Sequence, residues 1–205
     1  MTARLAPLSP LDPRSADPLL DDLVAFVGYR PNALLTMARK PGLLPAVLSL
    51  VAAALRGPGD LPLEIRFLAA CEASRHSGCF YSTVHSVHAA HHAGIEWTKL
   101  AELDRYAVSS RFSERERAAL AIAGAGATLP TRNAGPALDA AKVHFSEGQI
   151  LEIVAAVSLF GWFNRWNSLM QSELEDVPAQ ALHHVPWLAQ WQRAILEALG
   201  ASAPS

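Results

Sequence analysis

The chain has 205 residues, 51% of them hydrophobic, which is enough for one large domain with a real core. Its formal net charge is −2 with only 17 Lys and Arg, so the sequence lacks the basic footprint of a nucleic-acid-binding or anionic-lipid-binding protein, and we expect neither partner. The start MTARLAPLSPLDPRSADP is interrupted by prolines and charges and is unlike a secretory signal. The longest apolar run (43–55) is shorter than the roughly 20 residues of a membrane span, and two cysteines cannot form a disulfide framework. We therefore expect a soluble, cytoplasmic protein.

The order of the chain predicts an extended N-terminal arm over residues 1–17 and a single all-α domain over 18–205. Apolar residues recur at spacings of three and four along nearly the whole domain, and the breaks RPN, KPG, RGPGD, HSG and LPTRNAGP carry turn residues. No segment alternates long enough to be a strand. The predicted helices cover residues 18–28, 31–39, 43–56, 61–75, 78–93, 96–106, 114–128, 134–143, 147–174 and 178–198.

Two of these helix starts carry a capping box, in which two side chains satisfy free backbone N–H groups reciprocally. Ser113 pairs with Glu116, and Ser146 pairs with Gln149. We therefore expect these two helices to begin at 114 and 147.

The stretch SGCFYSTVHSVHAAHHAGI, residues 77–95, concentrates the polar chemistry of the chain. If Ser77 caps the helix from Gly78, Cys79 lies in the first turn, where free N–H groups and the helix dipole favour a reactive thiolate. At about 100° per residue, Cys79, Ser82 and Ser86 share one strip of the helix and the histidines share the next. His85 could then take a proton from the thiol, directly or through Ser82.

Simpler interpretations of the same residues stay open. A cysteine in an alanine-rich helix is more often inert packing than a nucleophile. His88 and His92 have a spacing that could hold a metal, with His85 as a third ligand, but no acidic or thiol ligand accompanies them, and we expect no metal and no cofactor. Cys71, in the middle of the preceding apolar helix, is expected to be a buried structural thiol.

The same stretch resembles a known family. GCFYSTVH is similar to the GCxYCxxH signature of the carboxymuconolactone decarboxylase superfamily, in its alkylhydroperoxidase D-like, peroxidase-related branch. GYRPNALLTMARKPGLL resembles that branch's N-terminal segment, and LFGWFNRWNSLMQSELE resembles its C-terminal FG-x-x-NRWN helix. Together these segments cover most of residues 26–176.

The resemblance implies an alkylhydroperoxidase D-like helical domain that assembles into an interlocked homo-oligomer, a dimer, trimer or hexamer. In relatives two motif cysteines cycle between dithiol and disulfide as peroxide is reduced, while a histidine and an upstream glutamate relay protons. Carried over, the first cysteine is Cys79, the second falls on Ser82 and the histidine on His85. The glutamate position lands near Phe67, and the nearest carboxylate we assign to the relay is Glu64, with Glu72 as another.

Because serine cannot form the disulfide, three functions remain. The first is an antioxidant, peroxidase-like oxidoreductase that uses Cys79 alone on an organic hydroperoxide or another small molecule, with an external thiol as reductant. The second is a non-redox lyase in which His85 moves protons, as in the decarboxylase branch. The third is a non-catalytic helical oligomer. Asn164 and Arg165, in the aromatic C-terminal helix, are expected at a subunit interface or at the pocket.

Overall fold

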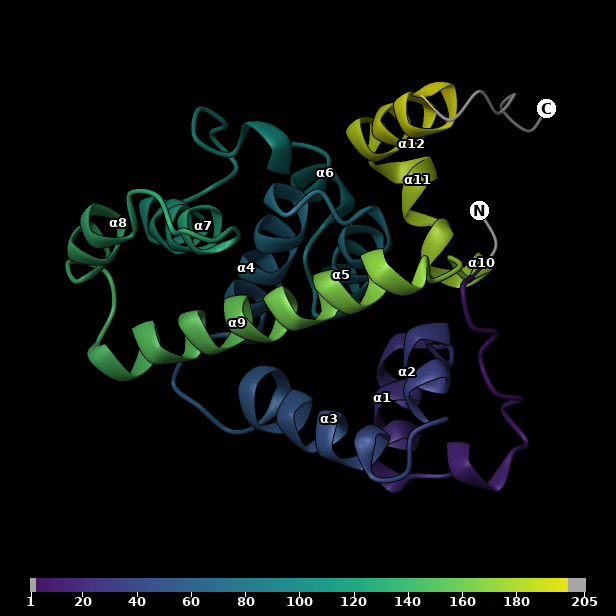
Figure 1. Cartoon of the computed structure of the whole chain (residues 1–205). Coiled ribbons are helices and arrows are strands. Elements are labelled where there is room, and N and C mark those ends of the chain that lie inside the picture. The colour runs from purple at the N-terminus through teal and green to yellow at the C-terminus, as the bar shows by residue number, and fades with distance from the viewer. Residues whose placement is uncertain (1–2, 199–205) are drawn as a thin grey trace.

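The computed structural model describes residues 3–198, and within them the chain is entirely helical, with no strand (Figure 1). A 3₁₀ turn covers Pro13–Ser15, a second covers Leu103–Arg105, and a π-helical turn covers Ala52–Arg56. The α-helices are α1 Pro18–Val27, α2 Asn32–Met37, α3 Leu43–Val51, α4 Leu63–His76, α5 Phe80–His92, α6 Trp97–Leu100, α7 Glu114–Gly126, α8 Ala134–Ala141, α9 Glu147–Met170, α10 Asp176–Ala179, α11 Ala181–His184 and α12 Pro186–Ala198.

The predicted fold class is confirmed, and so are both capping boxes, which begin α7 and α9. Several predicted boundaries are wrong. The helix over 96–106 is the short α6 followed by the separate 3₁₀ turn Leu103–Arg105. The helix over 178–198 is replaced by α10, α11 and α12. The break before α12 arises because Val185 is extended immediately before Pro186, and proline disfavours the helical conformation in the residue before it. The helix expected to run to 174 ends at Met170, where Gln171 takes a left-handed conformation (φ 50°) that closes it.

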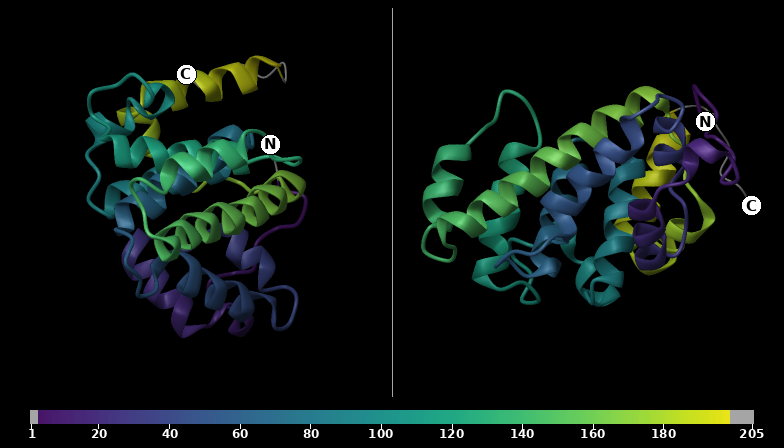
Figure 2. Two further views of the ribbon diagram at one scale, coloured as in Figure 1. Left: turned by 90° about the vertical axis from the view of Figure 1, so that its left-hand side faces the viewer. Right: turned by 90° about the horizontal axis from the view of Figure 1, so that it is seen from below.

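The long helix α9 crosses the middle of the molecule and organises the rest (Figures 1 and 2). The antiparallel pair α4 and α5 packs on one side of it, α1 to α3 lie on the other, and α7 and α8 gather at its N-terminal end. Helix α4 is buried without interruption from Ile65 to Ser74, because it is covered by α5, α7 and α9. The core is therefore built around α4, and the functional motif on α5 is its direct neighbour.

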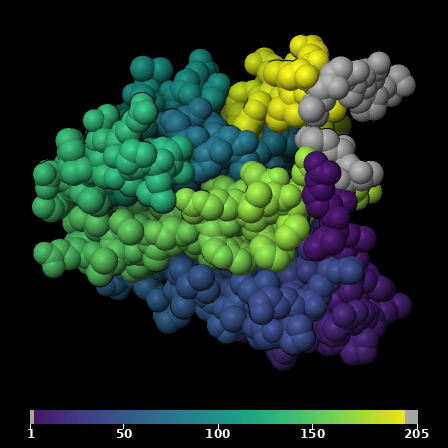
Figure 3. Space-filling view, in the orientation of Figure 1, coloured from purple at the N-terminus to yellow at the C-terminus, as the bar shows by residue number. Residues whose placement is uncertain are grey.

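One face of α9 lies open along its length in the space-filling view (Figure 3). Its exposed apolar side chains include Leu151, Val154 and Leu169, which are 69%, 38% and 77% exposed. The homo-oligomer expected from the sequence stays a prediction.

No helix within residues 3–198 is long and apolar enough to cross a membrane.

The N-terminal segment runs back along its own chain. The Arg4 N–H donates to the Met170 carbonyl at 2.9 Å, and the Leu8 N–H donates to the Leu35 carbonyl at 3.3 Å. The Leu8 side chain joins the hydrophobic core. This arm thereby ties the end of α9 to α2, the two elements that flank the polar end of the site described below.

An ion pair between a buried arginine and a partly exposed glutamate fixes the turn that follows the π-helical segment. Arg66 on α4, 5% exposed, lies 2.5 Å from the Glu152 carboxylate on α9 and donates to the Gly57 carbonyl at 2.7 Å. A Cβ on Gly59 would come within 2.3 Å of an Arg66 nitrogen and a Glu152 oxygen, so a side chain there would have to displace the ion pair. The Arg66–Glu152 pair thus holds the segment that ends in Arg56 against α4 and α9.

Candidate functional site

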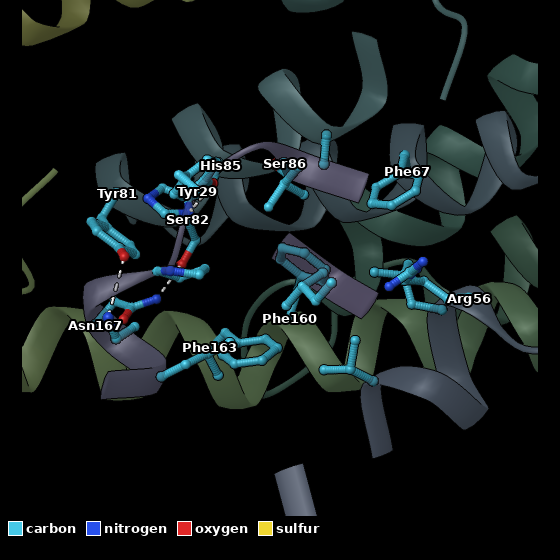
Figure 4. A pocket seen from close by; sticks show the side chains of 18 residues that line it. Tyr29, Arg56, Phe67, Tyr81, Ser82, His85, Ser86, Phe160, Phe163 and Asn167 are labelled. Atoms are coloured by element: carbon cyan, nitrogen blue, oxygen red, sulfur yellow. Dashed lines mark hydrogen bonds between the residues drawn. The ribbon is translucent and has the colours of Figure 1, made fainter. Parts of the chain in front are cut away.

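A cavity of about 100 Å³ lies between α1, the α3–π-turn segment, α4, α5 and α9 (Figure 4). Most of its wall is apolar, with Phe67, Phe160 and Phe163 as the largest side chains. Polar side chains gather at one end of the view, where Tyr29, Tyr81, Ser82, His85 and Asn167 lie close together. This combination of a small apolar cavity and a few converging polar groups is typical of a site for a small organic molecule.

His85 is held at both ring nitrogens. Its Nε2 lies 2.7 Å from a carboxylate oxygen of Glu175, the residue just before α10, and its Nδ1 lies 2.8 Å from the Tyr29 hydroxyl. The His85 and Glu175 side chains are 14% and 13% exposed. The ring also stacks on Tyr81, one turn earlier on α5, with centroids 3.9 Å apart. These contacts fix both the position and the orientation of the imidazole.

Glu175 accepts two further hydrogen bonds, both at its other oxygen. The Tyr81 hydroxyl donates at 2.8 Å, and the backbone N–H of Asn32 at the start of α2 donates as well. Burial by itself would raise the pKa of Glu175, but the hydrogen bond from His85, its charge and these two donors together hold that pKa below its usual value. Glu175 is therefore ionised at neutral pH.

The two tyrosines stay protonated. Burial, and after it the negative charge of Glu175, raises the pKa of Tyr29, and the same two causes raise that of Tyr81. Since the ionised Glu175 can only accept, Nε2 of His85 carries a proton, and in the neutral tautomer that this fixes Nδ1 accepts from Tyr29. The arrangement is a relay from a phenol through an imidazole to a carboxylate, with Nδ1 as its basic atom.

The motif cysteine lies behind the cavity wall. Cys79 is 3% exposed and is absent from the residues that line the cavity, whereas Ser82 lines it. The Cys79 thiol donates to the Ser82 hydroxyl oxygen at 3.2 Å, and the Asn167 amide donates to that oxygen at 3.0 Å. Asn167 in turn accepts from Ser172 at 2.9 Å. Ser82 thus stands between the thiol and the cavity, and no direct hydrogen bond joins Cys79 to His85 in the described chain.

The predicted cap of α5 is wrong. Cys79 itself is the N-cap residue, with φ −92° and ψ 95°, and does not lie in the first helical turn. Gly78 takes a left-handed conformation (φ 70°) that turns the chain, and the Ser77 hydroxyl donates to the Ala127 carbonyl at 2.8 Å instead of capping the helix. The thiol of this N-cap residue still reaches Ser82, three positions later, at 3.2 Å.

The structure does not bring the predicted relay glutamates to His85. Glu64 is exposed in the first turn of α4 and does not line the cavity, and Glu72 is fully buried but pairs with Arg75 and His76. The position where the family's glutamate was expected is occupied by the cavity-lining Phe67. The carboxylate beside His85 comes instead from Glu175, 90 residues later in the sequence.

The other candidate residues from the sequence do not form part of the site. His88 Nε2 lies 3.0 Å from the Val27 carbonyl, and no cluster of three or more side chains able to hold a metal occurs in residues 3–198, so the alternative set of His85, His88 and His92 does not form. Cys71 is fully buried, and burial raises its pKa to about 12, as expected for a structural thiol.

In α9 the polar residue that reaches the cavity is Asn167. Asn164 is buried without a hydrogen-bond partner in the described chain, and Arg165 is exposed, donating only to the Gly161 carbonyl four residues earlier. Asn167, Tyr29 and Glu175 are site residues that the sequence argument did not single out. All three lie in the two flanking segments that carried the family resemblance: Tyr29 in the first, and Asn167 and Glu175 in the second. Those segments held the available signal.

Comparison with solved structures supports the fold. A variant of the debrominase Bmp8 with a cysteine changed to alanine, in complex with 2,3,4-tribromopyrrole, is 29% identical, with a TM-score of 0.82 over 89% of this chain and 97% of that chain. A peroxidase-related protein from Ralstonia eutropha with an alkylhydroperoxidase AhpD core is 18% identical, with a TM-score of 0.70 over 86% and 96%.

A second peroxidase-related protein, from Silicibacter sp. TM1040, is 22% identical, with a TM-score of 0.59 over 84% and 96% of the two chains. No protein-family model matches the chain, and no curated protein does. The chain therefore has the alkylhydroperoxidase D-like helical fold that its sequence predicted.

Proposed function

We propose that the chain is an enzyme that moves protons on a small, largely apolar organic molecule, with His85 as the acid–base group. One observation carries the proposal: His85 on the wall of an apolar cavity is bonded at Nε2 to the ionised Glu175 and at Nδ1 to Tyr29. A carboxylate that fixes the tautomer of a histidine and stabilises its cation is the usual support for a general base.

The relay accounts for every proton it moves. A substrate X–H bond in the cavity gives its proton to the Tyr29 oxygen as the Tyr29 hydroxyl hydrogen passes to Nδ1 of His85. The electron pair of that bond stays on the substrate, and the imidazolium that results is paired with Glu175. Reversal at a second substrate atom returns the proton, so the cycle is an isomerisation or, where a carbon–carbon bond breaks in between, a decarboxylation. Apolar walls that exclude water strengthen the Glu175–imidazolium pair.

A second candidate is the one-cysteine oxidoreductase predicted from the sequence. The Cys79–Ser82 hydrogen bond places the thiol one residue behind the cavity wall, and the fold is shared with peroxidase-related proteins and with a debrominase. In a peroxidase cycle the thiol would take one oxygen from a hydroperoxide, giving an alcohol and a sulfenic acid, and two molecules of an external thiol would regenerate it with release of water and a disulfide. This route requires Ser82 to move aside, because Cys79 is only 3% exposed.

Two readouts on the full chain separate the candidates. The first is deuterium incorporation from heavy water into small carbonyl compounds and ring compounds, followed by NMR. The second is a sulfenic-acid trap after a pulse of cumene hydroperoxide, followed by intact mass. Proton transfer by His85 predicts deuterium incorporation that is lost in His85→Gln and kept in Cys79→Ala. Arg165→Gln, an exposed change on α9, is the matched control and should leave both readouts unchanged.

The outcomes divide cleanly. Deuterium exchange that survives His85→Gln contradicts the proton-transfer proposal. A trapped adduct that requires Cys79 supports the oxidoreductase and makes thiol chemistry the main function. Silence in both readouts across a broad set of compounds favours the non-catalytic helical oligomer that the sequence left open.

A further inference from the structure

The end of the cavity away from His85 carries a single positive charge. Arg56 is the only Lys or Arg among the cavity-lining residues, and Figure 4 shows it at one end, with Tyr81, His85 and Asn167 at the other and Phe160 between them. Arg56 also lines a second, outer cavity formed by α1 and α3. The guanidinium therefore stands where the inner cavity meets the surface side of the molecule.

Packing, not ion pairing, positions this arginine. It is the last residue of the π-helical turn, and its guanidinium lies 4.9 Å from the centroid of the Phe26 ring, which in turn stacks on Phe67 at 5.6 Å. Within residues 3–198 the Arg56 side chain has neither a salt bridge nor a hydrogen bond, and Asp22, which lines the same outer cavity, does not pair with it. Its five N–H donors are free to bind an anion.

The charged groups at the two ends of the cavity differ in the number of hydrogen-bond and ion-pair partners they have. At the His85 end the negative charge of Glu175 is compensated by three donors and repels a second anion. At the Arg56 end the positive charge is uncompensated within the described chain. An anionic molecule with an apolar body is therefore oriented by the field of the cavity, charged group toward Arg56 and opposite end toward Tyr29 and His85.

We infer that the molecule bound in this cavity is a small organic anion, a short carboxylic acid or a compound with an equivalent anionic group, which pairs with Arg56 while its apolar body presents the reacting atom to Tyr29 and His85. A cavity of roughly 150 Å³ holds one benzene ring, so about 100 Å³ suits a body no larger than a short alkyl chain or one small ring. The inference gives the substrate class of the proposed function. It rests on that function only in placing the reacting atom of the substrate beside Tyr29 and His85.

Matched acid and amide pairs test the inference, because they have nearly the same shape and differ in charge. We would measure the binding of butanoate against butanamide and of cyclopropanecarboxylate against cyclopropanecarboxamide to the full chain by titration calorimetry or ligand-observed NMR. In each pair we expect the acid to bind about tenfold more tightly, a difference of about 1.4 kcal/mol. Arg56→Gln should bring the two members of a pair to within about twofold while leaving amide binding unchanged, and Arg56→Lys should retain part of the preference.

Two controls keep this test independent of catalysis. Arg165→Gln removes a cation of α9 that does not line the cavity and should keep the acid preference. His85→Gln should also keep it, although that variant loses proton transfer, so a failed binding test and a failed catalytic test are distinguishable. The inference is overturned if neither acid binds more tightly than its amide in the wild-type chain, or if Arg56→Gln leaves the preference intact.

Discussion

Replacing Glu175 by glutamine is the change whose consequence follows most directly from the geometry. The amide keeps the size of the carboxylate, and its oxygen can still accept from Tyr81 and the Asn32 N–H. Its NH₂ group then faces His85 Nε2, where the carboxylate oxygen stood 2.7 Å away. A donor at that place requires Nε2 to accept, so the ring proton moves to Nδ1 and the base that faced Tyr29 is lost.

The expected magnitudes separate catalysis from stability. An inverted tautomer with intact packing should reduce turnover by roughly 10²- to 10⁴-fold, while the loss of charge-assisted hydrogen bonding should lower the free energy of unfolding by only about 1–2 kcal/mol. Glu175→Ala removes all three acceptor contacts beside a buried histidine and should lower it by about 3–5 kcal/mol. For a chain of this length that corresponds to a melting temperature lower by roughly 6–20 °C.

The assay does not require a substrate. In protein labelled with ¹⁵N at the histidine rings, long-range ¹H–¹⁵N spectra distinguish the two neutral tautomers, and His85→Gln identifies the signals of His85. Wild type should show the proton on Nε2, and Glu175→Gln should show it on Nδ1. The same tautomer in both proteins would refute the relay as described, and so would a Glu175→Ala protein as stable as wild type.

Three further predictions follow from buried charges and thiols. Because the pKa of Glu175 is lowered in the folded chain, its contribution to stability is complete above a pH of about 4.3 and is lost as the pH falls through the lower folded value. The free energy of unfolding in urea, measured between pH 7 and pH 3, should therefore fall less steeply with acid in Glu175→Gln than in wild type. The same pH dependence in both proteins would contradict this. Cys71, with its pKa raised to about 12, should resist a thiol reagent at pH 8 until the chain is unfolded, and modification of native Cys71 detected by peptide mass would be inconsistent with its burial. Arg66→Met should lower the free energy of unfolding by about 1–3 kcal/mol, because Glu152 loses its cation but keeps the backbone donors of Asp60 and Leu61. Glu152→Gln alone should cost a similar amount if the ion pair holds the turn, and an Arg66→Met protein as stable as wild type would show that it does not.

Local features of the sequence account for most of the fold. The capping boxes at Ser113 and Ser146 predicted helix starts to the residue, because the bonds that define them join residues three positions apart. The boundary errors arose where a backbone conformation decided the outcome: Gly78 turns the chain so that Cys79, not Ser77, begins α5, and Gln171 closes α9. A pattern of apolar spacings does not record such single left-handed residues.

Only the site residues that lie close together in the sequence were predicted. Ser82 and His85 line the cavity from one helix, as their spacing implied, but the carboxylate that completes the relay lies 90 residues away, between α9 and α10. Glu175 sits in the acidic run SELED, which looks like an ordinary solvated helix start, and only tertiary packing turns it toward α5. The burial of Cys79 behind Ser82 also depends on tertiary packing, since Asn167 on α9 contributes to that hydrogen-bond chain.

The carboxylate of Glu175 joins three remote parts of the chain: the first amide of α2, the middle of α5 and the entrance to α10. The Asn32 N–H is therefore a probe of the site, since it can exchange with solvent only when α2 and the Glu175 segment separate. Its protection against hydrogen exchange reads out, at a single backbone position and without any substrate, the fraction of molecules in which the relay is assembled. The assembled state of the proposed relay is thus a thermodynamic population that can be measured separately from the stability of the helical core.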